Sequence, residues 1–409
     1  MKVWIKLLIG STLGIILGFL VPEHQWLLES LAWLEQFALR VGRYAILPML
    51  VFSLTIGIYE LRQDGQFWPL VFKNLLVIVS VTAFVIFAGV FTSLVFPPAR
   101  IPIMAEEQLN MISLDIAGNI MDLFPYNMLS VLAGDGVYLL PVCIFAFFLG
   151  MGLSYDKSYS KPVISLIDSL SRIFYHIASF FIEILGFLII VLAASWAMQF
   201  RAVIHARIFF DMILLLGIFS MILGFVILPL FLYFLRPKMN PWQVLYSSLG
   251  QAITAFFSGD ILFSLPVVMR HAKENFGVQR RSNTVSLALF STFCRAGSAM
   301  VAAVAFIVII RSYSSLGITM TEIISISFRT LLISFFLARH PGDGAYIALA
   351  VLCISYGQGF ERGYLILKPM AFYLIAIGSF LDVMIASFAT CMLGRISGYD
   401  KGKPSKKFI

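Results

Sequence analysis

Five ionisable residues in the C-terminal half of the chain stand in strongly apolar surroundings. Asp260 lies in "SGDILFSLP", Arg295 in "STFCRAGSAM", Asp382 in "GSFLDVMIASF", and both Arg339 and Asp343 lie in "ARHPGDG". A charge at the centre of a membrane helix costs about 2.5–3.5 kcal/mol on insertion scales, so such residues mark a site or pair with one another. For any single one, a snorkelling or solvated side chain is the alternative.

The charges indicate what such a site would hold. Two arginines and three aspartates sum to −1, which one proton, one metal cation or one cationic substrate group would neutralise. Asp260, Asp343 and His340 are the candidates for carrying a proton. Arg295 is a candidate for fixed charge compensation, and its alternative is to turn away and cap a carbonyl.

The stretch "HPGDG" fits a helix tip that approaches a ligand. Pro341 stops the incoming helix, and Gly342 and Gly344 let the backbone approach a bound molecule closely. Helix ends at such a tip leave N–H groups that favour an anion and carbonyls that favour a cation.

The composition places these residues in a membrane protein. Of the 409 residues, 60% are hydrophobic and 12% are charged, more apolar surface than a soluble domain can cover. The net charge of +8 lies largely in short loops and in the tail "KGKPSKK", which favours positive-inside topology over nucleic-acid binding. No phosphate-binding loop, metal cluster or nucleophile motif supports an enzyme, and the four cysteines have no metal spacing.

A membrane span needs about 20 mostly apolar residues. Eight such stretches are predicted: 4–22, 37–60, 70–97, 137–155, 162–198, 206–235, 281–310 and 364–394. Gly10, Gly14 and Gly18 in the first predict close helix packing. Two further stretches, 243–275 and 320–358, each have two short apolar arms around a tip and are predicted to be re-entrant hairpins.

Charge placement predicts the orientation. Residues 98–136 hold one base, Arg100, against five acids, whereas "DKSYSKP", "RPK" and the tail are basic. Both termini are therefore expected in the cytoplasm of a cell-membrane protein, with the first hairpin inserting from the cytoplasm and the second from outside.

The chain resembles the dicarboxylate/amino acid:cation symporters, the glutamate-transporter family. "AFFSGDILFSLPVVMRHAKENFGV" looks like that family's first hairpin, and "ARHPGDGAYIALA" lies on its A-G-V-P-G-A-G second tip. "TFCRAGSA" lies where the family has T-I-N-M-D-G-T-A, and "FLDVMIASFA" begins like its last-span L-D-x-x-R-T-x-x-N-V-x-G-D.

The resemblance implies an all-α polytopic fold with eight spans, two oppositely oriented hairpins and an elevator mechanism. It implies scaffold regions 1–69 and 137–205, and a transport domain formed by 70–136 and 206–409. It also implies a homotrimer. Asp382 falls on the aspartate that holds a substrate amino group, Ser298 and Gly297 fall on the unwound seventh span, and Pro341, Gly342 and Gly344 fall on the gate. With these, Arg339 and Asp260 complete the predicted substrate site.

Several positions depart from the family pattern. Ile385 replaces the arginine that reads an acidic side chain, and Ala389 replaces the asparagine at the α-carboxylate. Leu393 replaces the last-span sodium aspartate. The asparagine and the aspartate of N-M-D-G-T are replaced by Cys294 and Ala296. Most side-chain sodium ligands are thus missing, so no metal site is predicted, although a site built from backbone carbonyls stays open.

Two functions from different classes follow. The first is a secondary transporter of a small amino acid or (di)carboxylate that works without sodium, as an exchanger, a uniporter or a proton-coupled carrier. The second is a non-transporting sensor or structural relative. Such a protein would be expected to lose the residues that bind sodium and substrate.

Overall fold

The chain is all-helical in the parts that the computed structural model describes, which are residues 2–22, 24–102, 116–134, 136–155, 157–235, 240–313 and 318–399. No strand occurs in these ranges, so the predicted all-α class is confirmed. Glu106, Glu107, Asp115 and Asp135, "RPK" and the tail from residue 400 lie outside the described residues, and so does much of the charge that predicted the orientation.

Seven helices or helix pairs of the described chain are long and apolar enough to cross a bilayer, which makes this a multi-pass membrane protein. They are Val3–Leu20, Gln25–Gln63, Phe67–Val95, Tyr159–Ile204, Phe210–Phe234, Arg280–Tyr313 and Gly363–Ile396. The remaining predicted span, 137–155, is the fourth in chain order and corresponds to α6 (Leu139–Leu153), an apolar helix of 15 residues. At 1.5 Å per residue α6 measures about 22 Å, less than the hydrocarbon core, so its crossing stays a prediction.

Several spans are interrupted. Counted along the eight predicted spans, the second consists of α2 (Gln25–Arg43) and α3 (Ile46–Gln63). The sixth consists of α8 (Phe210–Ile222) and α9 (Leu228–Leu235), which are joined by a π turn. The seventh breaks at Cys294 and Arg295, between α12 (Arg280–Phe293) and α13 (Ala296–Tyr313). The eighth is continuous in α16 (Ala371–Ile396), which passes unbroken through Asp382 after a 3₁₀ segment.

The two stretches predicted as hairpins are helix pairs with tight tips. In the first, α10 (Pro241–Ser258) and α11 (Ile261–Glu274) are joined by Gly259, which has φ +63°, and by Asp260. In the second, α14 (Met320–Ser334) and α15 (Gly344–Tyr356) are joined through a short 3₁₀ turn and "HPGD". The side of the membrane from which each inserts stays a prediction.

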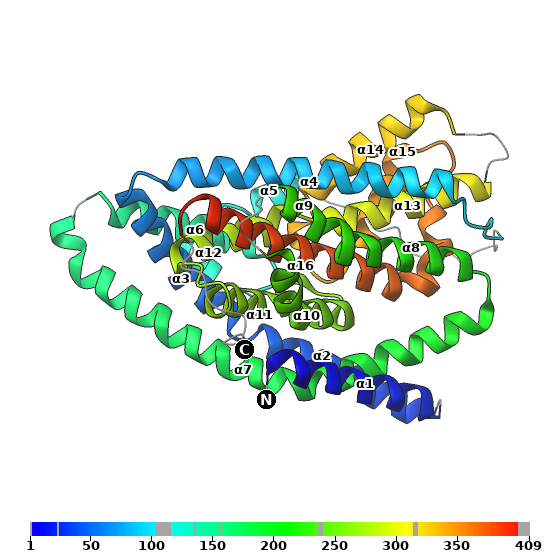
Figure 1. The fold of residues 1–409 in the computed structure, drawn as a ribbon, viewed down its shortest axis with the longest axis horizontal. Coiled ribbons are helices and arrows are strands. Elements are labelled where there is room, and N and C mark those ends of the chain that lie inside the picture. The colour runs from blue at the N-terminus through cyan, green and yellow to red at the C-terminus, as the bar shows by residue number, and fades with distance from the viewer. Residues whose placement is uncertain are drawn as a thin grey trace.

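One long helix borders the molecule. Figure 1 shows α7 (Lys157–Ala206) along one edge with α1 (Val3–Leu20) and α2 beside it, and α4 (Phe67–Val95) along the opposite edge. Gly10, Gly14 and Gly18 of α1 lie so close to the α7 backbone that an added Cβ would overlap it. The predicted close packing of this glycine row is confirmed.

The helices that carry the charged residues form the core. In Figure 1 α16 lies between α4 and α7. All residues of α13 from Ala296 to Ile310 are buried, as are all residues of α16 from Ser379 to Gly394. The intramembrane charges on or beside these helices are therefore shielded by protein rather than by lipid.

Candidate functional site

The two hairpin tips meet beside α16. The Ile261 N–H of the first tip donates to the Pro341 carbonyl of the second at 3.4 Å. The Ser379 hydroxyl of α16 donates to the Gly259 carbonyl at 2.5 Å and holds the first tip against this helix. Segments 80 or more residues apart in the sequence thus lie side by side.

Asp382 of α16 is completely buried, and its carboxylate lies against the start of α13. Its Oδ1 accepts hydrogen bonds from the backbone N–H groups of Gly297 at 2.7 Å and Ser298 at 3.2 Å. Its Oδ2 accepts the Ser298 hydroxyl at 2.6 Å. The break before Ala296 leaves the first N–H groups of α13 unpaired, and a helix N-terminus favours a carboxylate. The structure brings these three predicted residues together, while their contact with a substrate stays a prediction.

Arg295, 1% exposed, lies between Asp382 and the second tip. Its Nε is 3.5 Å from Asp382 Oδ2, and its Nη2 donates to the carbonyls of His340 at 2.9 Å and Pro341 at 3.2 Å. Gly344 makes room for the guanidinium, because an added Cβ there would overlap Nη2. Both uses considered for Arg295, pairing with an aspartate and capping carbonyls, occur together.

Asp260 is neutralised by a residue that the sequence did not single out. Arg43, at the end of α2, places its Nε 2.5 Å from Asp260 Oδ2, and the Asp260 side chain is 1% exposed. Asp260 Oδ1 also accepts from the Leu262 N–H at 2.9 Å and so caps α11. Asp260 therefore pairs with Arg43, whereas Arg295 pairs with Asp382. The available signal was an arginine inside the predicted span 37–60.

Arg339 faces away from Asp382. Its guanidinium forms an ion pair with Asp122 and donates to Asn119 Oδ1 at 3.1 Å, and its side chain is 42% exposed. Asp343 is exposed at the second tip, and among the described residues no hydrogen bond or ion pair to its carboxylate is found. Arg339 and Asp343 thus differ in their partners, although both line one cavity together with His340.

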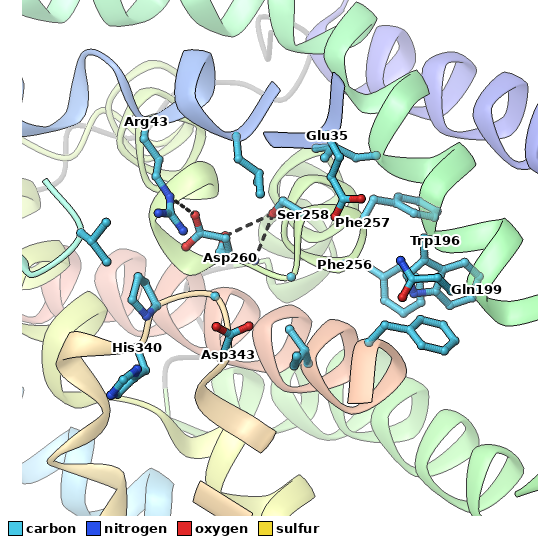
Figure 2. A pocket seen from close by; sticks show the side chains of 18 of the residues that line it. Glu35, Arg43, Trp196, Gln199, Phe256, Phe257, Ser258, Asp260, His340 and Asp343 are labelled. Atoms are coloured by element: carbon cyan, nitrogen blue, oxygen red, sulfur yellow. Dashed lines mark hydrogen bonds and ion pairs between the residues drawn. The ribbon is translucent and has the colours of Figure 1, made fainter. Parts of the chain in front are cut away.

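A cavity of about 350 Å³, here called the interface cavity, lies where the tips face α2 and α7. Figure 2 shows Glu35 and Arg43 from α2, Trp196 and Gln199 from α7, and the tip residues Asp260 and Asp343 around it. His340, Pro341, Gly342 and Arg339 also line it, whereas Arg295, Asp382, Gly297, Ser298 and Gly344 do not. The predicted site residues therefore divide between a buried ion pair and an open cavity, with the second tip contributing to both.

Residues 3–395 match the model of the sodium:dicarboxylate symporter family. The chain belongs to this family, whose members are secondary transporters. It is 21% identical to a proton/sodium-glutamate symport protein of Bacillus subtilis over 85% of this chain and 82% of the relative. It is 24% identical to a serine/threonine transporter of Lacticaseibacillus paracasei over 93% and 81%. It is 25% identical to the rat excitatory amino acid transporter 1 over 53% and 40%.

The positions at which this chain departs from the symporter-family pattern hold apolar, buried residues. Ile385, Ala389 and Leu393 on α16 and Cys294 and Ala296 at the break of the seventh span are all buried. In the part of the chain that the structure describes, no group of three His, Cys, Asp or Glu side chains could hold a metal ion. The oxygens that converge at the break, from Asp382, His340 and Pro341, are already bound to Arg295. These oxygens therefore already have a cationic partner, and the loss of sodium coupling stays a prediction.

Proposed function

We propose that this protein is a secondary transporter of a small amino acid or a carboxylate that does not use a sodium gradient. The observation that supports it is the position of Arg295. Its guanidinium lies 3.5 Å from the Asp382 carboxylate and donates to two carbonyls of the second tip. Carboxylate and carbonyl oxygens are the ligands that hard cations prefer, so a covalently attached cation takes the place of a diffusible one.

A tethered cation changes the energetics of the cycle. A bound sodium ion is released on the far side and transfers the energy of its gradient, whereas Arg295 stays with the protein in every state. Transport would then be exchange or uniport, or would be coupled to protons carried by Asp260, Asp343 or His340.

The proposed cycle is an elevator motion between two bodies. Residues 1–69 and 137–205 would form the scaffold, which the tight contact of α1 with α7 supports. Residues 70–136 and 206–409 would form the mobile unit with both tips. Three scaffolds would form a homotrimer in the cell membrane, and both termini would be cytoplasmic.

The range of substrates that fit is limited by which arginines are free to bind a carboxylate. The first two relatives above are named for glutamate and for serine and threonine. Ile385 replaces the arginine expected to read an acidic side chain, and Arg295 and Arg339 are engaged with Asp382 and Asp122. A side chain without a carboxylate therefore suits this site better than that of glutamate.

The test is uptake into proteoliposomes. Labelled serine, alanine and glutamate would be offered with sodium or potassium outside, with and without an opposing pH gradient. We expect uptake to agree within about twofold between the two cations, since about twofold corresponds to only a few tenths of a kcal/mol. Uptake that requires an inward sodium gradient would refute the proposal.

A second candidate, a non-transporting relative, is favoured by the same contacts, because Arg295 also ties the second tip to the core. A thermal-shift screen of the purified protein against amino acids and dicarboxylates, repeated with Asp382→Ala, separates the two. Ligand stabilisation without any uptake would favour a sensor, and uptake would exclude the second candidate.

A further inference from the structure

We propose that the interface cavity binds a ligand of net positive charge, with the ammonium or guanidinium group held by Asp343 and Glu35. This proposal is about ligand binding in the cavity and does not require transport. Its extension, that the cationic ligand is the transported substrate, rests on the function proposed above. The two statements are tested separately below.

The first argument is the charge balance of the cavity. Asp260 is paired with Arg43, and Arg339 is paired with Asp122 outside the cavity. Glu35 accepts the Ser195 hydroxyl at 2.5 Å and has no basic partner among the described residues. With the exposed Asp343, two carboxylates remain without a counter-charge. A cavity with uncompensated negative charge favours a cation.

The second argument is the aromatic wall. Trp196 of α7 contacts Phe256 and Phe257 at the end of α10 and Phe372 at the start of α16, with ring centroids 5.0–5.9 Å apart. All four rings line the cavity, and Figure 2 shows the labelled rings on the side that also holds Gln199. Aromatic faces attract organic cations and offer little to a carboxylate. They also favour an alkyl ammonium over a hydrated metal ion.

The third argument is size and place. A volume of about 350 Å³ lies within the range of pockets that bind small molecules. Glu35 belongs to α2, whereas Asp343 belongs to the second tip. A cationic ligand would therefore contact both bodies of the proposed elevator at once and bias their relative position through its own charge.

The experiment compares ligands that differ in charge and little else. Binding of L-lysine, L-norleucine, L-glutamate and cadaverine to the purified full chain would be measured by thermal shift and by calorimetry. Lysine and norleucine differ in the side-chain ammonium. We expect lysine and cadaverine to bind and norleucine to bind about tenfold or more weakly, since a hydrogen bond to a charged group contributes about 1.5–3 kcal/mol.

Variants locate the binding. Asp343→Asn and Glu35→Gln should each weaken lysine binding by about tenfold or more. Glu29→Gln, which removes an exposed carboxylate from the same helix, should leave it unchanged. Circular dichroism and the melting temperature without ligand establish that each variant is folded. Equal binding of norleucine or glutamate, or full lysine binding by both cavity variants, would overturn the proposal.

Uptake then separates the two proposals. Lysine binding that depends on Asp343, together with no uptake of any compound, supports the cavity as a cation site and refutes transport. Sodium-independent uptake of serine or glutamate that Asp343→Asn leaves unchanged supports transport and overturns the cationic substrate.

Discussion

The Arg295–Asp382 pair shows how two opposite charges are kept in the core of a membrane protein. Asp382 has three hydrogen bonds from the start of α13, and Arg295 has two carbonyl partners at the second tip. Breaking one partner of a buried pair leaves an uncompensated charge, which costs more than removing both. The pair therefore has a thermodynamic signature that can be measured apart from transport.

Asp382→Asn should destabilise the protein more than the double change Asp382→Asn with Arg295→Met. The single change leaves the guanidinium buried without its counter-charge and should cost about 3–5 kcal/mol, whereas the double change removes both charges. Melting temperatures in detergent would show the order. Arg329→Met is the matched control, because among the described residues this guanidinium contacts only the Ser355 carbonyl and the Tyr356 ring. Equal melting temperatures for the single and double variants would contradict the charge argument.

Arg295→Met should also expose the oxygens that the guanidinium occupies. Asp382, His340 and Pro341 would then present a carboxylate and two carbonyls to a diffusible cation. Sodium chloride should raise the melting temperature of Arg295→Met more than choline chloride does, because a ligand that binds only the folded state stabilises it. The unmodified protein should respond alike to the two salts. An equal response of both proteins would mean that Arg295 does not occupy a cation site.

At the scale of elements, the sequence predicted the helices and hairpin tips better than the ion pairs between them. Apolar runs, Pro341 and the glycines placed both hairpin tips, because helix-ending signals are local. Arg43 was missed since its partner, Asp260, is more than 200 residues away and only the tertiary fold joins them. The Arg339–Asp122 pair was missed for the same reason, because these residues are also far apart in sequence, and the place of Arg339 in the substrate site stays a prediction.

The second tip depends on one glycine for its contact with the core. Gly344→Ala should displace Arg295, because the added Cβ would overlap Nη2, and overpacking of this kind costs about 1–3 kcal/mol. Gly342→Ala is the matched change two residues earlier, where the Cβ would meet Arg43 Nη2 at an ordinary 3.5 Å. Thermal melts of both variants are the measurement. The prediction is wrong if the two alanines cost the same.

At the scale of the whole molecule, two ion pairs differ in where they lie relative to the proposed boundary between scaffold and mobile unit. The Lys6–Glu183 ion pair joins α1 to α7 inside the proposed scaffold. The Arg43–Asp260 pair joins α2 to the first tip, across the proposed boundary between scaffold and mobile unit. An elevator must keep the first contact and break the second in each cycle.

Cross-linking these two contacts should therefore have opposite effects on transport. In a Cys143→Ala background, which leaves only buried native cysteines, cysteines would replace Arg43 and Asp260 in one variant and Lys6 and Glu183 in another. A short bifunctional thiol reagent should abolish uptake by the first variant, reversibly with reductant, and spare the second. The reference for each is the same variant before cross-linking, which separates the effect of the tether from that of the lost ion pair. Uptake that survives a complete Arg43–Asp260 tether would mean that α2 and the first tip move as one body, and the division of the chain into scaffold and mobile unit would have to be redrawn.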